Sequence, residues 1–183
     1  MAWSPNGRQL ATGSNDNMAL IWDPRNLEAP VHTLTQHQSA IKAMSWCPWQ
    51  QSTLATGGGT SDRTIKFWNA NTGNLIQSVD CGSQVSSLLW NADYKELISS
   101  HGYQNFQLNV WKYPDMTKVT DLRGHTGRIL KAVSSPDGQT VASAASDETI
   151  RLWKVWPTQQ KKKAVKSLGQ EKSGSLLSQR TIR

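Results

Sequence analysis

Aspartate and histidine side chains recur along the chain at positions from which an Asp–His pair could do acid–base chemistry. The aspartates are Asp16, Asp62 and Asp147, and the histidines are His37 and His125. A carboxylate that orients an imidazole is the usual partner of a catalytic histidine. The same residues recur from one segment to the next, however, whereas a catalytic pair is usually needed once. We therefore interpret these side chains as structural parts of a repeated unit.

Other residues that could do chemistry lack the partners that the chemistry needs. Gly57-Gly58-Gly59 is not followed by the Lys and Ser/Thr of a phosphate-binding loop, so we predict a strand-to-strand turn there. Cys47 and Cys81 give neither a disulfide framework nor zinc-ligand spacing, and we expect Cys81 to be a buried thiol in a reducing compartment. No nucleophile elbow is present. The sequence predicts a protein that is not an enzyme and that needs no metal or cofactor.

Tryptophans define the period of the repeated unit. They are Trp22, Trp68, Trp111 and Trp153, at spacings of 46, 43 and 42 residues. A period of about 40–45 residues with four short strands is typical of a propeller blade. A turn residue stands six positions before each of them: Asp16, Asp62, Asn105 and Asp147. The turn carboxylate can accept a hydrogen bond from the histidine of the blade, while the indole ring fills the core between blades.

The fold class is therefore all-β, a WD-repeat β-propeller with about four consecutive blades over residues 1–154. The predicted strands are 10–12, 18–22 and 32–35 in the first blade; 41–46, 53–56, 64–68 and 75–79 in the second; 84–90, 96–99, 106–111 and 118–121 in the third; and 128–133, 141–144 and 149–153 in the fourth.

The ends of the chain do not coincide with the ends of a blade. The run Ala2-Trp3-Ser4-Pro5-Asn6-Gly7 matches residues 133–138, which places Met1 inside an innermost strand, and no outer strand follows the fourth blade. We expect blades upstream of this arc to be absent, so that the chain is a fragment or an isoform of something longer.

Residues 155–183 are predicted to be a disordered basic tail. Seven Lys and Arg against one Glu in residues 157–183 give a net charge of +6, out of +7 for the whole chain. The blades are therefore almost neutral and carry no bulk basic face. The tail ends in Ile182-Arg183, a pair that a tetratricopeptide groove could hold through an apolar pocket, an acid and donors to the carboxylate. No apolar run is long enough to span a membrane.

Several stretches together resemble the Fizzy family of coactivators of the anaphase-promoting complex, a ubiquitin ligase. They are Ala2-Trp3-Ser4-Pro5, Gly13-Ser14-Asn15-Asp16-Asn17, Trp46-Cys47-Pro48-Trp49-Gln50, residues 54–63 with the triple glycine, Tyr94-Lys95-Glu96-Leu97-Ile98-Ser99, Trp111-Lys112-Tyr113-Pro114, Gly124-His125-Thr126, Asp147-Glu148-Thr149 and the terminal Ile182-Arg183. The sequence departs from the family at Ser99-Ser100-His101, where Gly or Ala usually precedes the histidine, and in a shortened connection around residues 25–30.

The resemblance implies a seven-bladed propeller, of which this chain is the C-terminal arc, that reads short linear degrons in substrates. Asn15, Thr60, Gln84 and Arg128 match the family's residues for the KEN box, and Glu148 matches the acid that faces the arginine of a destruction box. The implied partners are the tetratricopeptide subunits of the ligase, bound through the tail, substrates such as cyclins and securin, and mitotic checkpoint proteins. Neither a membrane nor nucleic acid is an expected partner, and the implied location is cytoplasm and nucleus.

Two alternatives stay open at the level of the sequence. One is a generic WD-repeat scaffold, held to nucleic acid or chromatin by the basic tail with a steep salt dependence. The other is a shortened, inactive chain that competes with its longer relative for the ligase.

Overall fold

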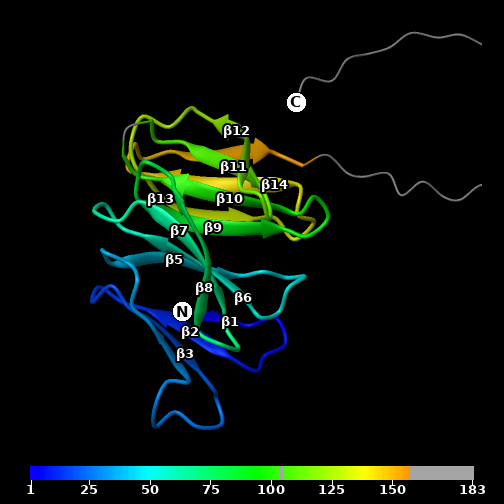
Figure 1. The fold of residues 1–183 in the computed structure, drawn as a ribbon. Coiled ribbons are helices and arrows are strands. Elements are labelled where there is room, and N and C mark those ends of the chain that lie inside the picture. The colour runs from blue at the N-terminus through cyan, green and yellow to red at the C-terminus, as the bar shows by residue number, and fades with distance from the viewer. Residues whose placement is uncertain (104, 157–183) are drawn as a thin grey trace, which may run out of the picture.

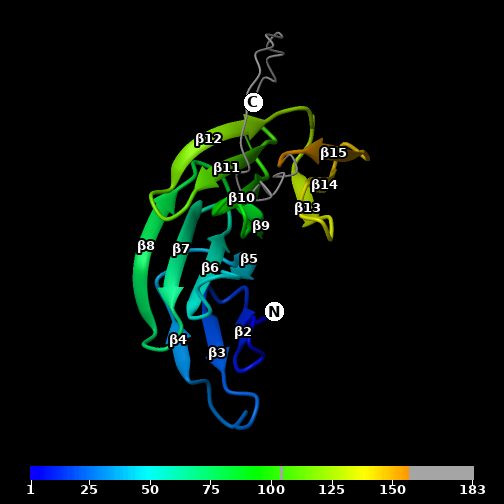
Figure 2. The ribbon, with the colours of Figure 1, turned by 90° about the vertical axis from the view of Figure 1, so that its right-hand side faces the viewer.

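The computed structural model describes residues 1–103 and 105–156, and these residues contain strands and turns but no helix. Four antiparallel sheets follow one another around an open arc, from the first sheet in blue to the last in yellow and orange (Figure 1 and Figure 2). In each sheet the strands pair in chain order, so that every sheet is a meander of neighbouring strands. None of the described residues lies in a helix that could cross a membrane.

The described residues form fifteen strands. The first sheet contains β1 (Ala2–Trp3), β2 (Leu10–Gly13), β3 (Ala19–Trp22) and β4 (His32–Leu34). The second contains β5 (Ile41–Trp46), β6 (Thr53–Gly58), β7 (Thr64–Asn69) and β8 (Asn74–Asp80). The third contains β9 (Val85–Asn91), β10 (Glu96–His101), β11 (Leu108–Lys112) and β12 (Thr117–Leu122). The fourth contains β13 (Ile129–Ser134), β14 (Thr140–Ala145) and β15 (Ile150–Lys154).

This arrangement confirms the propeller fold class that the tryptophan period predicts. Most predicted strand ends agree with the structure within two residues. β11 begins at Leu108 rather than at residue 106, because Phe106 has φ 47 and so lies outside the strand region. β1 begins at Ala2 rather than including Met1, since its ladder with β2 ends at the pair Ala2–Ala11 and leaves the terminal residue exposed.

The core lies between successive sheets. Ile21 of β3 and Leu54 of β6 are fully buried in the contact of the first two sheets. Phe67 of β7 and Val85 of β9 are fully buried between the second and third, and Ile98 and Ile129 between the third and fourth. Complete burial of one such side chain stabilises the fold by about 1.5–3 kcal/mol. The sheets therefore hold one another in place, and the loops at their ends are mounted on a rigid base.

The sequence analysis predicts a turn at the triple glycine, and this prediction is wrong for the first two residues. Gly57 and Gly58 belong to β6, and only Gly59 lies beyond the strand. A Cβ atom on Gly57 would come within 2.6 Å of Val85 Cγ1 in β9 of the next sheet. Glycine is needed here because the second and third sheets approach each other too closely for a side chain.

The folded body also extends two residues beyond the predicted boundary. Val155 packs against the core of the last two sheets, and Trp156 is 2% exposed there. The indole N–H of Trp156 donates to Glu96 Oε2 at 2.7 Å. Residues 157–183, including Ile182 and Arg183, lie outside the described residues.

Candidate binding face

Loops at one end of the four sheets form what we call the crown face: residues 14–18, 59–63, 81–84, 102–103, 105–107, 123–128 and 146–149. Backbone hydrogen bonds tie these loops together, from Ile41 N to Ser14 O at 3.0 Å and from Ser146 N to Arg128 O at 2.9 Å. The first of these bonds crosses from one sheet to the next, so the crown loops are held relative to one another.

Beneath the crown face of the second sheet, a histidine links a loop to the strands. His37 Nδ1 is hydrogen-bonded to the carboxylate of Asp62, and His37 Nε2 lies 2.6 Å from Thr56 Oγ1. The indole N–H of Trp68 donates to the same hydroxyl at 2.8 Å. Burial lowers the pKa of His37, although the carboxylate of Asp62 acts in the opposite direction.

The fourth sheet repeats this arrangement. His125 Nδ1 lies 2.8 Å from Asp147 Oδ2, His125 Nε2 lies 2.7 Å from Ser143 Oγ, and Trp153 Nε1 donates to Ser143 Oγ at 2.8 Å. Burial by itself would raise the pKa of Asp147, but hydrogen bonds from the side chain of Thr149, the backbone of Thr126 and His125 hold that pKa below its usual range. Both histidines are enclosed by protein atoms, which suits an internal brace rather than contact with a substrate.

The first sheet keeps only part of the brace. Trp22 Nε1 donates to Thr12 Oγ1 at 2.9 Å, as in the other sheets. Asp16 accepts from the backbone N–H of Met18 at 3.0 Å. No histidine bonds to Asp16 among the described residues. The carboxylate therefore shapes its own turn.

The residue after each turn residue has a left-handed backbone. These residues are Asn17, Arg63, Phe106 and Glu148, with φ of 70, 60, 47 and 61. The turn thus has the same shape in all four sheets, and in the last sheet it presents the exposed side chain of Glu148 at the crown face.

Two of the four predicted KEN residues are in direct contact. Thr60 Oγ1 donates to Gln84 Oε1 at 3.0 Å, which joins the crown loops of the second and third sheets. This bond uses the carbonyl oxygen of Gln84 and leaves its amide N–H groups for another acceptor. Thr60 is exposed and Gln84 is half-buried.

Asn15 lies on a neighbouring part of the crown face. Its Oδ1 accepts from Lys42 Nζ at 3.2 Å, and both side chains are exposed. The contact leaves the amide N–H groups of Asn15 for another acceptor and adds a cation that the sequence analysis did not single out. Lys42 follows directly after Ile41, the first residue of β5, and a spacing argument based on turns and tryptophans has no reason to select it.

Arg128 and Glu148 are exposed at the crown face, in loops that the Ser146–Arg128 backbone bond joins. Neither side chain has a hydrogen-bond or ion-pair partner within residues 1–103 and 105–156. No such bond connects Arg128 to Gln84, or Asn15 to Thr60, in that part of the chain. The structure therefore places all five predicted residues on one face, but only Thr60 and Gln84 in contact.

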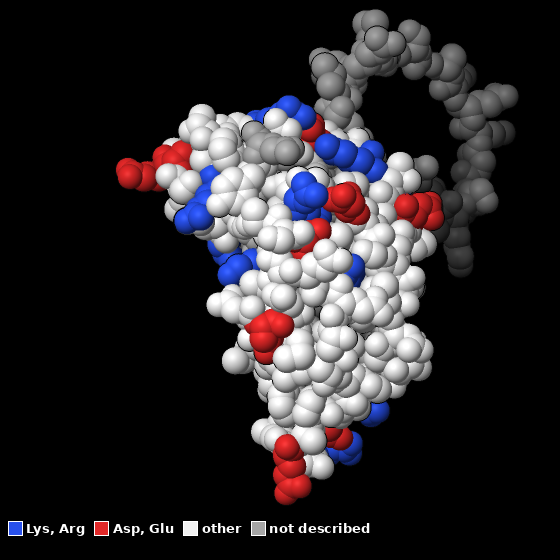
Figure 3. Space-filling view, turned by 60° about the vertical axis from the view of Figure 1, so that its left-hand side comes forward, with Lys and Arg blue, Asp and Glu red and all other residues white. Residues whose placement is uncertain are grey.

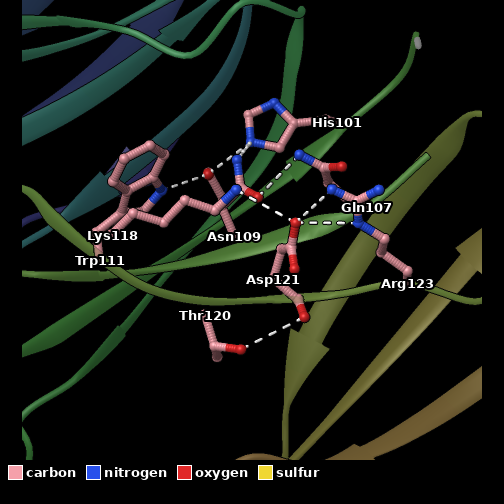
Figure 4. Close-up of polar contacts among 9 residues, drawn as sticks. His101, Gln107, Asn109, Trp111, Lys118, Thr120, Asp121 and Arg123 are labelled. Carbon is pink, nitrogen blue, oxygen red and sulfur yellow. Dashed lines mark hydrogen bonds and ion pairs between the residues drawn. The ribbon is translucent and has the colours of Figure 1, made fainter. Parts of the chain in front are cut away.

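In the third sheet a different residue takes the place of the loop histidine, and the sequence analysis did not identify it. Cys81 and Asn105 stand where the other sheets have His and Asp, and burial raises the pKa of the Cys81 thiol to about 12. The indole N–H of Trp111 donates to Ser99 Oγ at 2.7 Å, which in turn lies 2.8 Å from His101 Nε2 (Figure 4). His101 comes from the strand β10 rather than from a loop. The missing loop histidine was the signal that could have led to it.

Figure 4 also shows polar neighbours of this site on β11, on β12 and just beyond the ends of these two strands. Asn109 Nδ2 lies 3.1 Å from His101 Nε2, and Gln107 Nε2 donates to Asn109 Oδ1 at 3.0 Å. Asp121 of the outer strand β12 pairs at 2.8 Å with Arg123, which follows that strand. Burial lowers the pKa of His101 to about 4, so its ring is neutral at physiological pH.

Charges on the described blades are of mixed sign. Figure 3 shows Lys and Arg interspersed with Asp and Glu over a largely uncharged surface. A hollow of about 490 Å³ lies at the other end of the sheets, lined in part by Asn6, Arg8 and Gln51, and it contains none of the predicted site residues. The described residues contain no cluster of His, Cys, Asp and Glu that could hold a metal ion.

A family model and individual proteins of known sequence lead to the same family. The family model described as CDC20/Fizzy WD40 domain matches residues 1–153. The chain is 53% identical to "Anaphase-promoting complex subunit cdc20" of Dictyostelium discoideum, over 88% of this chain and 33% of that protein. It is 52% identical to "Cell division cycle 20.1, cofactor of APC complex" of Arabidopsis thaliana, over 93% of this chain and 39% of that protein.

Among solved structures, a chain in "Crystal Structure of Mitotic Checkpoint Complex" superimposes with a TM-score of 0.82 at 47% identity. The match covers 85% of this chain and 50% of that chain. This chain therefore spans half or less of the length of each of these proteins.

Proposed function

The chain belongs to the CDC20/Fizzy WD40 family, and we propose on that basis that it acts as a substrate-recognition adaptor of the anaphase-promoting complex. In this role it does no chemistry itself. It binds degrons of the KEN type on the crown face and brings them to the ubiquitin ligase, in mitosis. The names of its relatives, which include a subunit and a cofactor of that complex, support the assignment.

The contact between Thr60 and Gln84 is the observation that carries the proposal. It fixes two polar side chains from different sheets on an exposed surface, with the amide N–H groups of Gln84 left for a ligand. Arg128 supplies a guanidinium without a partner in the described part of the chain, which suits the glutamate of a Lys-Glu-Asn sequence. Asn15 supplies a second amide, which suits the asparagine of that sequence.

Glu148 is proposed to face the arginine of a destruction box. Its side chain is exposed in a tight turn at the edge of the crown face, in the last described sheet. A carboxylate in that position can form a bidentate pair with a guanidinium. Cyclins and securin belong to the proposed class of substrates, and mitotic checkpoint proteins to the proposed partners.

The proposed contact with the ligase falls on the end of the chain. Ile182 and Arg183 lie outside the described residues, so the proposal rests on their chemistry as an apolar residue and an arginine at a free carboxylate. A tetratricopeptide groove is the proposed partner. Cytoplasm and nucleus are the proposed location.

A titration of the chain with a fluorescent peptide that contains Lys-Glu-Asn tests the proposal. We expect Thr60→Val and Gln84→Ala each to weaken binding about threefold to tenfold, since each removes one hydrogen bond at the site. Thr72→Val is the matched control, because Thr72 is an exposed threonine in a loop at the opposite end of the sheets. Equal binding of a peptide with Ala-Ala-Ala in place of Lys-Glu-Asn would reject the proposal.

A further inference from the structure

We propose that His101 is a positioning residue for Gln84. In the third sheet it connects a crown loop to the strands, as His37 does in the second sheet and His125 in the fourth. The proposal rests on the proposed function, because Gln84 is one of the residues assigned to the degron. It concerns a side chain that is 1% exposed and therefore cannot touch a peptide itself.

The three histidines occupy the same place relative to a tryptophan and a hydroxyl group. Each indole N–H donates to a Thr or Ser hydroxyl, and each hydroxyl lies within 2.6–2.8 Å of a histidine Nε2. The three sets are Trp68, Thr56 and His37; Trp153, Ser143 and His125; and Trp111, Ser99 and His101. The hydroxyl accepts from the indole and donates to the imidazole, so Nε2 is an acceptor in each set. The proton of the neutral ring is then on Nδ1.

The Nδ1 atom is where the sets differ. In the second and fourth sheets it meets the carboxylate of Asp62 or Asp147, which ties the entering loop to the turn. The third sheet has Asn105 in the turn, and His101 Nδ1 instead lies 3.3 Å from the backbone carbonyl of Gln84. The tie to the turn is made separately, by Ser83 Oγ, which donates to Tyr103 O and accepts from Tyr103 N, both at 3.0 Å.

Gln84 is confined both at its backbone carbonyl and at its side chain. The backbone carbonyl oxygen of Gln84 lies 3.3 Å from His101 Nδ1, and the side-chain Oε1 of Gln84 accepts a hydrogen bond from Thr60. A Cβ atom on Gly102 would lie 2.8 Å from Gln84 Nε2, so the side chain lies directly over that glycine. These contacts leave Gln84 with little rotamer freedom to lose when a peptide binds, which favours binding.

The test is a double-mutant cycle on the full chain with the Lys-Glu-Asn peptide as the probe. His101→Phe keeps a ring in the site but removes both ring nitrogens, Nδ1 that faces Gln84 and Nε2 that faces Ser99 and Asn109. We expect it to weaken peptide binding about threefold to tenfold. In the Gln84→Ala background the same substitution should change the affinity less than about twofold. Thr12→Val is the matched control, because it breaks the corresponding bond between Trp22 and Thr12 in the first sheet, where the hydroxyl has no bond to a histidine of the described residues.

Each outcome decides the question. An equal loss from His101→Phe with and without Gln84, or no loss at all, overturns the proposal. If Thr12→Val weakens binding as much as His101→Phe, the effect is one of general stability and the proposal also fails. If Gln84→Ala itself leaves peptide binding unchanged, the assignment of Gln84 to the degron falls instead.

A second readout does not depend on peptide binding. ¹⁵N relaxation of the Gln84 side-chain amide should show a rigid group in the unaltered chain and faster motion in His101→Phe. Unchanged relaxation contradicts the positioning role even if the chain binds no degron. Changed relaxation without peptide binding supports the positioning role and rejects the proposed function.

Discussion

Arg128 brings the only positive charge among the four residues proposed for the KEN box. Its side chain is exposed, and no carboxylate of the described residues neutralises it. Asn15, Thr60 and Gln84 offer neutral hydrogen bonds, which are individually weaker than a charge-assisted one. Most of the discrimination for an acidic residue in the peptide should therefore come from Arg128.

Arg128→Asp should weaken binding of the Lys-Glu-Asn peptide by a factor of about 10 to 100, because it replaces attraction to the peptide glutamate with repulsion. The melting temperature should stay the same, since the side chain is exposed and has no hydrogen-bond or ion-pair partner among the described residues. Isothermal titration calorimetry on the folded variant measures the loss. Arg8→Asp reverses an exposed arginine at the opposite end of the sheets and should bind as the unaltered chain does. A loss of equal size in both variants would mean that only net charge matters.

The lowered pKa of His101 predicts that the stability of the fold depends on pH. Its pKa falls from an ordinary value of 6.5 to about 4 in the folded chain, so protonation favours the unfolded state between these values. The stabilisation is present above pH 6.5 and is lost as the pH falls to about 4. We expect a loss of at most about 3 kcal/mol in the free energy of unfolding over this window. Urea unfolding at pH 7 and pH 4 measures it, and His101→Phe should lose less.

Sequence reasoning at the scale of single residues is limited to positions that repeat. Asp62 and Asp147 are recognisable because each stands six residues before a tryptophan, and each lies against a histidine in the structure. His101 and Lys42 have no residue of the same type at the corresponding position of the other repeats. Their roles depend on which loops adjacent sheets bring together, and that depends on packing over long sequence distances.

Among the strands, β6 shows how closely two sheets approach. All six of its residues are buried, and its small side chains and glycines allow β9 of the next sheet to lie against it. The sequence predicts this strand correctly up to Thr56, because Thr53 to Thr56 contain strand-forming residues before the glycines. It does not reveal that Gly57 and Gly58 continue the strand, since glycine favours turns by itself and only the neighbouring sheet explains its presence here.

Gly57→Ala should destabilise the chain by about 1–3 kcal/mol, because the new methyl group meets Val85 of a neighbouring sheet at 2.6 Å and that sheet must move. Chemical denaturation followed by tryptophan fluorescence measures the change. Gly59→Ala is the comparison, since its methyl group would meet the Ser39 hydroxyl at 2.7 Å, which can rotate away, and the backbone oxygen of Ala40 only at 3.1 Å. A larger loss for Gly59→Ala than for Gly57→Ala would show that the close approach of the sheets is not the constraint.

Across the whole molecule, the repeat period bears on the order of the sheets, and the position of the charges bears on the partners. The period predicts the meander sheets and their order, which the structure confirms. The net charge of +7 suggests nucleic acid, but +6 of it belongs to residues 157–183. The order of the sheets could be predicted because each is local in sequence, whereas the contacts on the crown face join residues up to 27 positions apart, as in Asn15 and Lys42.

A peptide of residues 157–183 separates the proposed ligase contact from binding by charge alone. We expect it to retain the tetratricopeptide subunits of the ligase from mitotic extract, and a peptide without Ile182 and Arg183 to lose them. Quantitative immunoblotting of the retained subunits gives the ratio. Equal capture by both peptides, removed by moderate salt, would favour the generic scaffold with a basic tail.

The most direct test of degron recognition on the crown face is a map of where the peptide binds. Two-dimensional ¹H–¹⁵N spectra of the chain, recorded during titration with the Lys-Glu-Asn peptide, report this residue by residue. We predict shifts in residues 14–18, 59–63, 81–84 and 123–128, and none in the loops at the opposite end around Arg8 and Thr72. Shifts confined to that opposite end, or no shifts at peptide concentrations that saturate related adaptors, would contradict it.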